Sequence, residues 1–314
     1  MKKLCFVLAA IMLTLSLVGC GGDEVTTTTD DGDDTINQVK KVFYVEKMTE
    51  LDGVVSVVKN EQESIDGCLA YDLVLNLDGV YLDAQIVMPQ DYRYKDYSTV
   101  LYFPETGLNY YNLRYLYASN GVIVVRLGYR SGESVEQKKD FCGKDYEDVK
   151  SFFEICKQCD FLTRAGITVF GSSEGSVRAL KLAVDYPNDI MGCAVIDVIS
   201  DIESFMNARE ESIRQLFEYQ IGGSIEDMPE EYQKRSAIYF ADKIDIPVMI
   251  LAYKDHPLVP IEQATKLRDA IISGGGECEY QVLDEINSDF GVSALYAMNS
   301  WYVQNKVDNG FINE

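Results

Sequence analysis

Short apolar runs alternate with amphipathic stretches from residue 98 onward. The apolar runs, each expected to form a strand, cover residues 99–103, 122–127, 167–170, 193–198, 247–252 and 280–283. Helices are expected between or after them at residues 109–119, 143–158, 175–186, 262–274 and 292–305. Runs that are apolar at nearly every position fit strands buried on both faces, which is typical of a parallel sheet covered by helices on both sides. The second part of the chain therefore predicts an α/β fold.

The segment before residue 98 has a different pattern. Residues 42–45 and 54–58 are short β-prone runs, and residues 69–77 and 80–88 are longer alternating segments joined by Asp78-Gly79, a strong hairpin signal. An antiparallel β-meander followed by a mostly parallel sheet is the layout of the α/β-hydrolase fold. We expect one such domain over residues 40–310, with a helical, charge-rich insertion at 199–242 near the mouth of the active site.

The pentapeptide Gly171-Ser172-Ser173-Glu174-Gly175 lies between the apolar run 167–170 and a helix-prone segment. A G-x-S-x-G sequence in this strand–turn–helix context is typical of a nucleophile elbow. The glycines are needed because the sharp turn brings strand and helix close together. Ser173 is therefore the predicted nucleophile, and the backbone N–H of Glu174 is a predicted oxyanion donor.

A nucleophilic serine needs a base, and the base needs an acid to orient it. In this fold the chain order is serine, then aspartate or glutamate, then histidine. Asp255 follows the apolar run 247–252 and is the candidate acid, although it also fits an ordinary solvated loop aspartate.

Four stretches resemble the catalytic domain of the prolyl oligopeptidase family, and the resemblance extends over about residues 80–305. They are Gly128-Tyr129-Arg130-Ser131-Gly132, Asp189 to Val198, Arg235 to Ile244, and Asp255-His256-Pro257-Leu258-Val259-Pro260. The resemblance implies serine hydrolysis of peptide bonds, or of esters as in some relatives, with Ser173 as nucleophile and Asp255 as triad acid. It also implies a base near Asp289-Phe290-Gly291, where Ser288 stands in place of the expected histidine.

The chain has one histidine, His256, and it adjoins Asp255 in sequence. Serine does not titrate near neutral pH, so Ser288 cannot replace an imidazole base. Pro104 also departs from the usual oxyanion loop, because proline has no N–H. Three alternatives remain: His256 acts as the base, the protein is a weak or unconventional hydrolase, or it has lost triad catalysis and serves as a ligand-binding pseudo-hydrolase.

Peptidases of this family usually carry a large β-propeller before the catalytic domain, which limits the size of their substrates. Only a short β-rich segment precedes the predicted domain here. If the protein is active, we expect small esters or short peptides as substrates, bound at an open mouth shaped by residues 199–242.

The N-terminal segment predicts export. Lys2 and Lys3 precede a short apolar run that ends at Gly19-Cys20, so residues 1–19 read as a lipoprotein signal peptide and Cys20 as the lipidated residue. The alternative is an ordinary signal peptide cut elsewhere. Residues 20–39 are rich in aspartate and threonine and are expected to form an acidic disordered tether between the membrane anchor and the domain.

Composition limits the partners. The formal net charge is −23, which disfavours nucleic acid and anionic lipid. No cofactor is predicted, and no metal site, because acidic residues are dispersed and a lone histidine offers no ligand cluster.

After Cys5 and Cys20, six cysteines remain that can pair in an oxidising compartment: Cys68, Cys142, Cys156, Cys159, Cys193 and Cys278. Cys156 and Cys159 have redox-motif spacing, but buried thiols or a structural bridge are the favoured interpretation.

Overall fold

The computed structural model describes residues 41–64, 67–104, 114, 118–132, 138–284, 297–298, 300–302 and 304. Residues Val39–Glu314 form one compact unit. The predicted signal peptide, Cys20 and the tether lie outside the described residues. None of the described helices has both the length and the apolar composition of a membrane span.

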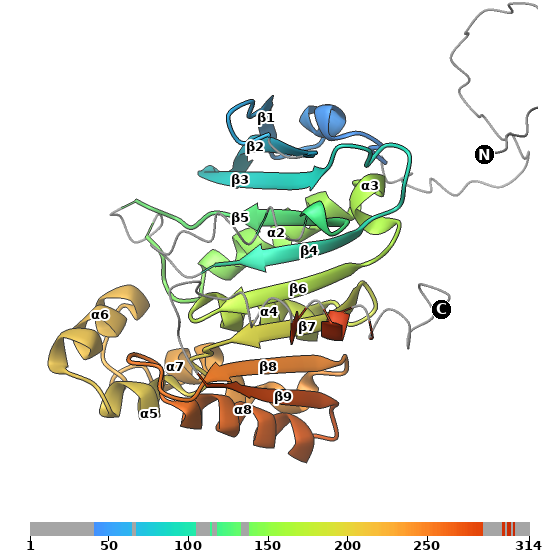
Figure 1. The fold of residues 1–314 in the computed structure, drawn as a ribbon. Coiled ribbons are helices and arrows are strands. Elements are labelled where there is room, and N and C mark those ends of the chain that lie inside the picture. Colours follow the sequence, from blue (N-terminus) through green and yellow to red (C-terminus); the bar gives the residue numbers. More distant parts are fainter. Residues whose placement is uncertain are drawn as a thin grey trace, which may run out of the picture. The chain divides into compact units, whose positions relative to one another are not determined.

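Nine strands of the described chain form one sheet in the order β1-β2-β3-β5-β4-β6-β7-β8-β9 (Figure 1). Strands β1, β2, β3 and β5 pair antiparallel, and every pair from β5 to β9 is parallel. The strands are β1 Val54–Lys59, β2 Cys68–Leu77, β3 Val80–Pro89, β4 Ser98–Phe103, β5 Val122–Leu127, β6 Ile167–Ser172, β7 Ile190–Ile196, β8 Val248–Tyr253 and β9 Cys278–Leu283. The predicted α/β-hydrolase architecture is confirmed.

The central strands carry two cores because their side chains alternate between the two faces of the sheet. Leu101 and Phe103 of β4 join the larger core, which is shared with the helices. Val100 and Tyr102 of the same strand join a second core, which Met298 and Tyr302 help to cover. All six residues of β4 are buried, as the unbroken apolar run predicted.

The helices are η1 Val45–Glu50, α2 Asp145–Lys157, α3 Asp160–Thr163, α4 Gly175–Asp185, α5 Ile202–Asn207, α6 Glu211–Ile221, α7 Pro229–Arg235, η2 Ala237–Tyr239, η3 Ala241–Lys243 and α8 Ile261–Ser273. Figure 1 shows α5 and α6 at the side of the sheet toward which the arrows of β4 and β6 point. The insertion between β7 and β8 therefore lies at the carboxyl ends of parallel strands, where α/β proteins bind their ligands.

One local prediction is wrong. Residues 42–45 were expected to be β-prone, but Val42 makes a single bridge to Cys159, and a 3-10 helix begins at Val45. That helix buries Val45 and Met48 in the larger core, so tertiary packing overrides the local preference. The predicted helices 109–119 and 292–305 lie mostly outside the described residues.

Candidate active site

Ser173 lies in the turn between β6 and α4 with a backbone φ of +49°. A left-handed conformation is costly for a residue with a Cβ, so the surrounding contacts must hold it. The Ser173 N–H donates to the Ile196 carbonyl at the end of β7 (2.9 Å), and the Ser176 N–H donates to the Ser173 carbonyl (3.1 Å). This is the geometry of the predicted nucleophile elbow.

The two glycines of the elbow are needed for close approach. A Cβ on Gly171 would lie 2.5 Å from Cα of Ser176, and a Cβ on Gly175 would overlap the carbonyl oxygen of Phe103. The start of α4 therefore lies directly against the end of β4. Glu174 is the N-cap residue of α4, so its backbone lies at the positive end of the helix, where an oxyanion is stabilised.

A cavity of about 240 Å³ opens beside Ser173. Its walls are mostly apolar and come from the loop after β5, from the insertion and from the loop after β8. The lining residues are Lys139, Phe141, Ser173, Glu174, Ile199, Phe205, Arg209, Ile213, Leu216, Phe217, Gln220, His256, Leu258 and Val259. Ser173 is 8% exposed, and its hydroxyl makes no hydrogen bond with any described residue.

His256 shares this cavity with Ser173, but its ring is engaged elsewhere. Nδ1 accepts the backbone N–H groups of Leu258 (3.1 Å) and Val259 (2.8 Å). Because Nδ1 is an acceptor, the neutral ring carries its proton on Nε2, which lies 3.8 Å from Oδ2 of Asp197. Burial and then the positive charge of Arg209 lower the pKa of His256. No lone pair of the imidazole is thus offered to Ser173 in this arrangement.

Asp197 is a functional candidate that the sequence reasoning missed. It follows β7 directly, has φ +50° and is 5% exposed. Its Oδ1 accepts the N–H of Tyr253 (3.3 Å), while Oδ2 faces His256. The signal was present in the sequence: a carboxylate inside the apolar run 193–198 must be buried, and a buried carboxylate needs partners.

Asp255, the predicted triad acid, lies on the loop after β8 and is exposed. It makes no hydrogen bond or ion pair with the described residues. Its role as acid, the role of His256 as base and the nucleophilic role of Ser173 stay predictions. Ser288 lies outside the described residues, so its position relative to Ser173 is not described.

The rim of the cavity is anchored by polar contacts. Lys139 Nζ and the Glu174 carboxylate form an ion pair at 2.7 Å. Pro104 is buried, and its carbonyl accepts a hydrogen bond from the Tyr129 hydroxyl. The Tyr129 ring lies 3.8 Å from the Arg178 guanidinium carbon. Pro104 and Tyr129 thus meet beside the start of α4.

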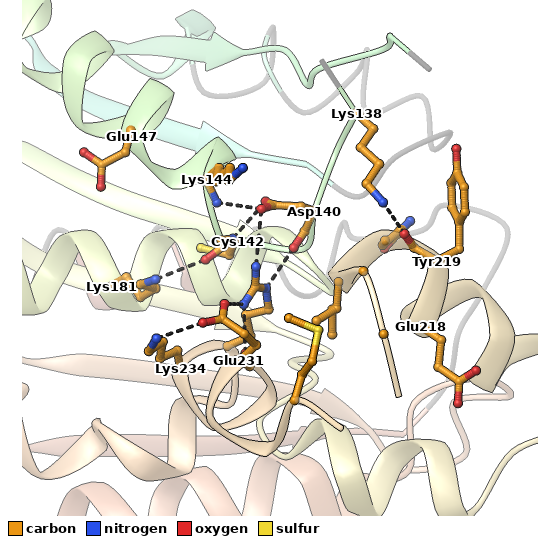
Figure 2. Close-up of a pocket in the computed structure, with 17 residues that line it drawn as sticks. Lys138, Asp140, Cys142, Lys144, Glu147, Lys181, Glu218, Tyr219, Glu231 and Lys234 are labelled. Atoms are coloured by element: carbon orange, nitrogen blue, oxygen red, sulfur yellow. Dashed lines mark hydrogen bonds and ion pairs between the residues drawn. The ribbon is translucent and has the colours of Figure 1, made fainter. Parts of the chain in front are cut away.

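A second cavity, of about 940 Å³, lies between the loop 138–144 and helices α6 and α7 (Figure 2). Four of its charged side chains pair with one another, since Arg235 pairs with Asp140 and Glu231, and Lys234 pairs with Glu231. Arg235 donates to the Asp140 carbonyl (2.9 Å) and pairs with Glu231 at 2.6 Å. Lys181 Nζ donates to the Cys142 carbonyl (3.1 Å). Gln220 of α6 lines both cavities, so this helix is their common wall.

Cys142, Cys156, Cys159, Cys193 and Cys278 have free thiols. Cys156 and Cys159 are buried, and burial raises the pKa of Cys159 to about 12, whereas redox thiols need a lowered pKa. Within the described ranges, no group of three histidine, cysteine, aspartate or glutamate side chains is arranged to hold a metal ion.

The sheet order and the elbow define an α/β-hydrolase with a serine at the nucleophile position. The family model for the prolyl oligopeptidase family matches residues 109–296, and the chain belongs to this family. The uncharacterized peptidase YtmA of Bacillus subtilis (strain 168) is 27% identical over 155 residues, which are 49% of this chain and 60% of that protein.

Two solved structures share the fold. Puromycin hydrolase superposes with a TM-score of 0.61 at 20% identity, over 75% of this chain and 39% of its own. An S-formylglutathione hydrolase from Agrobacterium tumefaciens superposes with a TM-score of 0.62 at 13% identity, over 81% of this chain and 99% of its own. This chain thus spans less than two thirds of both YtmA and puromycin hydrolase.

Proposed function

We propose that this protein is an exported, lipid-anchored serine hydrolase of prolyl oligopeptidase type that acts on small ester or short peptide bonds. The observation that carries the proposal is Ser173: it has a strained backbone at the carboxyl end of β6, an adjoining cavity, and a hydroxyl that bonds none of the described residues. The hydroxyl attacks the substrate carbonyl, and the start of α4 faces the oxyanion that forms. The small cavity favours a small acyl or side-chain group.

The proton of Ser173 must be accepted by a base, and His256 is the sole imidazole of the chain. For this role the ring must release the Leu258 and Val259 N–H groups, so that a lone pair can turn toward the hydroxyl. Asp197 is better situated than Asp255 to stabilise the imidazolium, because it is buried and faces Nε2. Acylation therefore requires a rearrangement of the loop after β8.

A second candidate function is a ligand-binding lipoprotein that has kept the hydrolase cavity without turnover. The engaged lone pair of His256 favours it, as does the serine at position 288. In that case a ligand raises the melting temperature without being consumed.

A fluorophosphonate probe separates the two functions. If the protein is a hydrolase, the wild type is labelled stoichiometrically, Ser173→Ala is not labelled, and His256→Ala reacts more slowly by roughly 10²-fold or more, because the base is lost. Absence of labelling between about pH 6 and 9 in folded wild-type protein would overturn the hydrolase proposal. Labelling that is unchanged in His256→Ala would remove His256 as the base.

A further inference from the structure

Arg209 lies in the turn between α5 and α6 and is the cation of the Ser173 cavity that has no acidic partner among the described residues. Lys139, the other cation that lines it, is neutralised by Glu174 at 2.7 Å. The Arg209 guanidinium makes no hydrogen bond or ion pair with any described residue, and its Nε is buried without a partner. The guanidinium carbon lies 5.0 Å from the centroid of the Phe205 ring.

Arg209 is half-buried, and its buried Nε–H lacks a partner among the described residues. An unpaired polar group away from water is costly, and proteins normally pair such groups. This chain has 51 acidic residues against 28 lysines and arginines, so acidic partners are abundant. Glu210 is the next residue in the sequence, yet it forms no ion pair with Arg209. The guanidinium is therefore kept available on the wall of the cavity, and a ligand is the natural source of the missing negative charge.

The surroundings define the rest of that ligand. Phe141, Phe205 and Phe217 form an aromatic cluster on the cavity wall. The centroid of the Phe217 ring lies 4.7 Å from that of Phe141 and 5.8 Å from that of Phe205. These rings favour an apolar chain. The charge of Arg209 also acts across the cavity, because it contributes to the lowered pKa of His256.

We propose that the Ser173 cavity selects substrates whose acyl group is a short apolar chain ending in a carboxylate, with that carboxylate paired to Arg209. Arginine suits this role because its planar fork can bind a carboxylate through two parallel hydrogen bonds. This proposal rests on the proposed function, which places the scissile bond at Ser173. The binding of the carboxylate itself does not require turnover.

Two esters of equal chain length test the selectivity: 4-nitrophenyl hexanoate and the mono-4-nitrophenyl ester of adipic acid. In the wild type we expect kcat/KM to be higher for the anionic ester by about tenfold or more, since a hydrogen bond to a charged group is worth that factor. Arg209→Met should abolish the preference, and Arg209→Lys should keep part of it. Arg214→Met is the matched control, because Arg214 lies on α6 outside the cavity lining and bonds Asn207.

An unchanged ratio of the two rates in Arg209→Met would overturn the inference. If the wild type hydrolyses neither ester and the fluorophosphonate probe does not label Ser173, the proposed function fails, and calorimetry on Ser173→Ala still decides the inference. That variant should bind monomethyl adipate more tightly than methyl hexanoate by about tenfold, and the added Arg209→Met change should remove the difference. Equal binding of the two compounds by Ser173→Ala would overturn the carboxylate site.

Discussion

Ser173, Asp197 and Asp255 show which roles of single residues can be predicted from the sequence and which cannot. Ser173 was predictable because the glycines, the preceding strand and the following helix all lie within a few residues of it. Asp197 was not, because its value comes from contacts with Tyr253 and His256, more than fifty residues away. Asp255 has the expected place in the order of residues, but its side chain is exposed.

His256 gives a prediction on pH dependence. Its pKa is lowered in the folded state, so between that pKa and the ordinary value of about 6.5 the unfolded chain binds more protons. The free energy of unfolding therefore decreases as the pH falls through this window. The total loss is about 1.4 kcal/mol for each unit by which folding lowers the pKa of His256. His256→Asn should lack this part of the slope, because asparagine does not titrate and its oxygen can still accept a backbone N–H.

Urea denaturation at several pH values between about 5 and 8 measures this difference. Asp255→Asn is the control, since an exposed carboxylate without partners in the described chain should leave the slope in this range unchanged. Parallel stability profiles for wild type and His256→Asn would contradict the prediction.

At the scale of elements, the strands were predictable where the chain is mostly apolar, as in β4, β5 and β8. The helices of the insertion were predicted only as a helical region, because their positions depend on packing against loops that are distant in sequence. Arg235 of α7, for example, is held by Asp140, 95 positions earlier. The error at residues 42–45 has the same origin, since burial of Val45 and Met48 decided the local structure.

Helix α6 is held by few side chains. Phe217 and Ile221 are its buried residues, whereas Leu216 is 47% exposed. We expect Phe217→Ala to lower the free energy that keeps α6 closed by about 3 kcal/mol, which speeds amide exchange in this helix by roughly a hundredfold. Leu216→Ala, on the same helix, should change the rate of amide exchange much less. Hydrogen exchange read by mass spectrometry distinguishes these cases, and an equal loss of protection in β6 would mean that α6 does not open independently.

At the scale of the whole molecule, the fold class followed from the order of apolar runs, and the match to the prolyl oligopeptidase family confirms the resemblance seen in the motifs. The proposed ligand preference did not follow, because the net charge of −23 gives no hint of a local cation at the cavity. The net charge describes the whole chain, whereas the proposed recognition depends on Arg209, whose guanidinium pairs with no acidic side chain of the described residues.

The anchoring proposal also belongs to this scale. Expressed in a bacterial host with an alkyne-tagged fatty acid, the full chain should incorporate the label and sediment with membranes, because acylation of Cys20 supplies the anchor. Cys20→Ala should lose both properties, while Cys278→Ala, which removes a partly exposed cysteine of the folded domain, should keep them. Labelling that persists in Cys20→Ala would reject the lipidation site.

Because α6 lies between the two cavities, we expect ligand binding in one cavity to affect ligand binding in the other. A ligand that holds the helix in place from one side reduces the ordering cost for a ligand on the other side. Thermodynamic linkage makes this coupling equal in both directions, so we expect a ligand in the larger cavity of Figure 2 to change the affinity for a ligand beside Ser173.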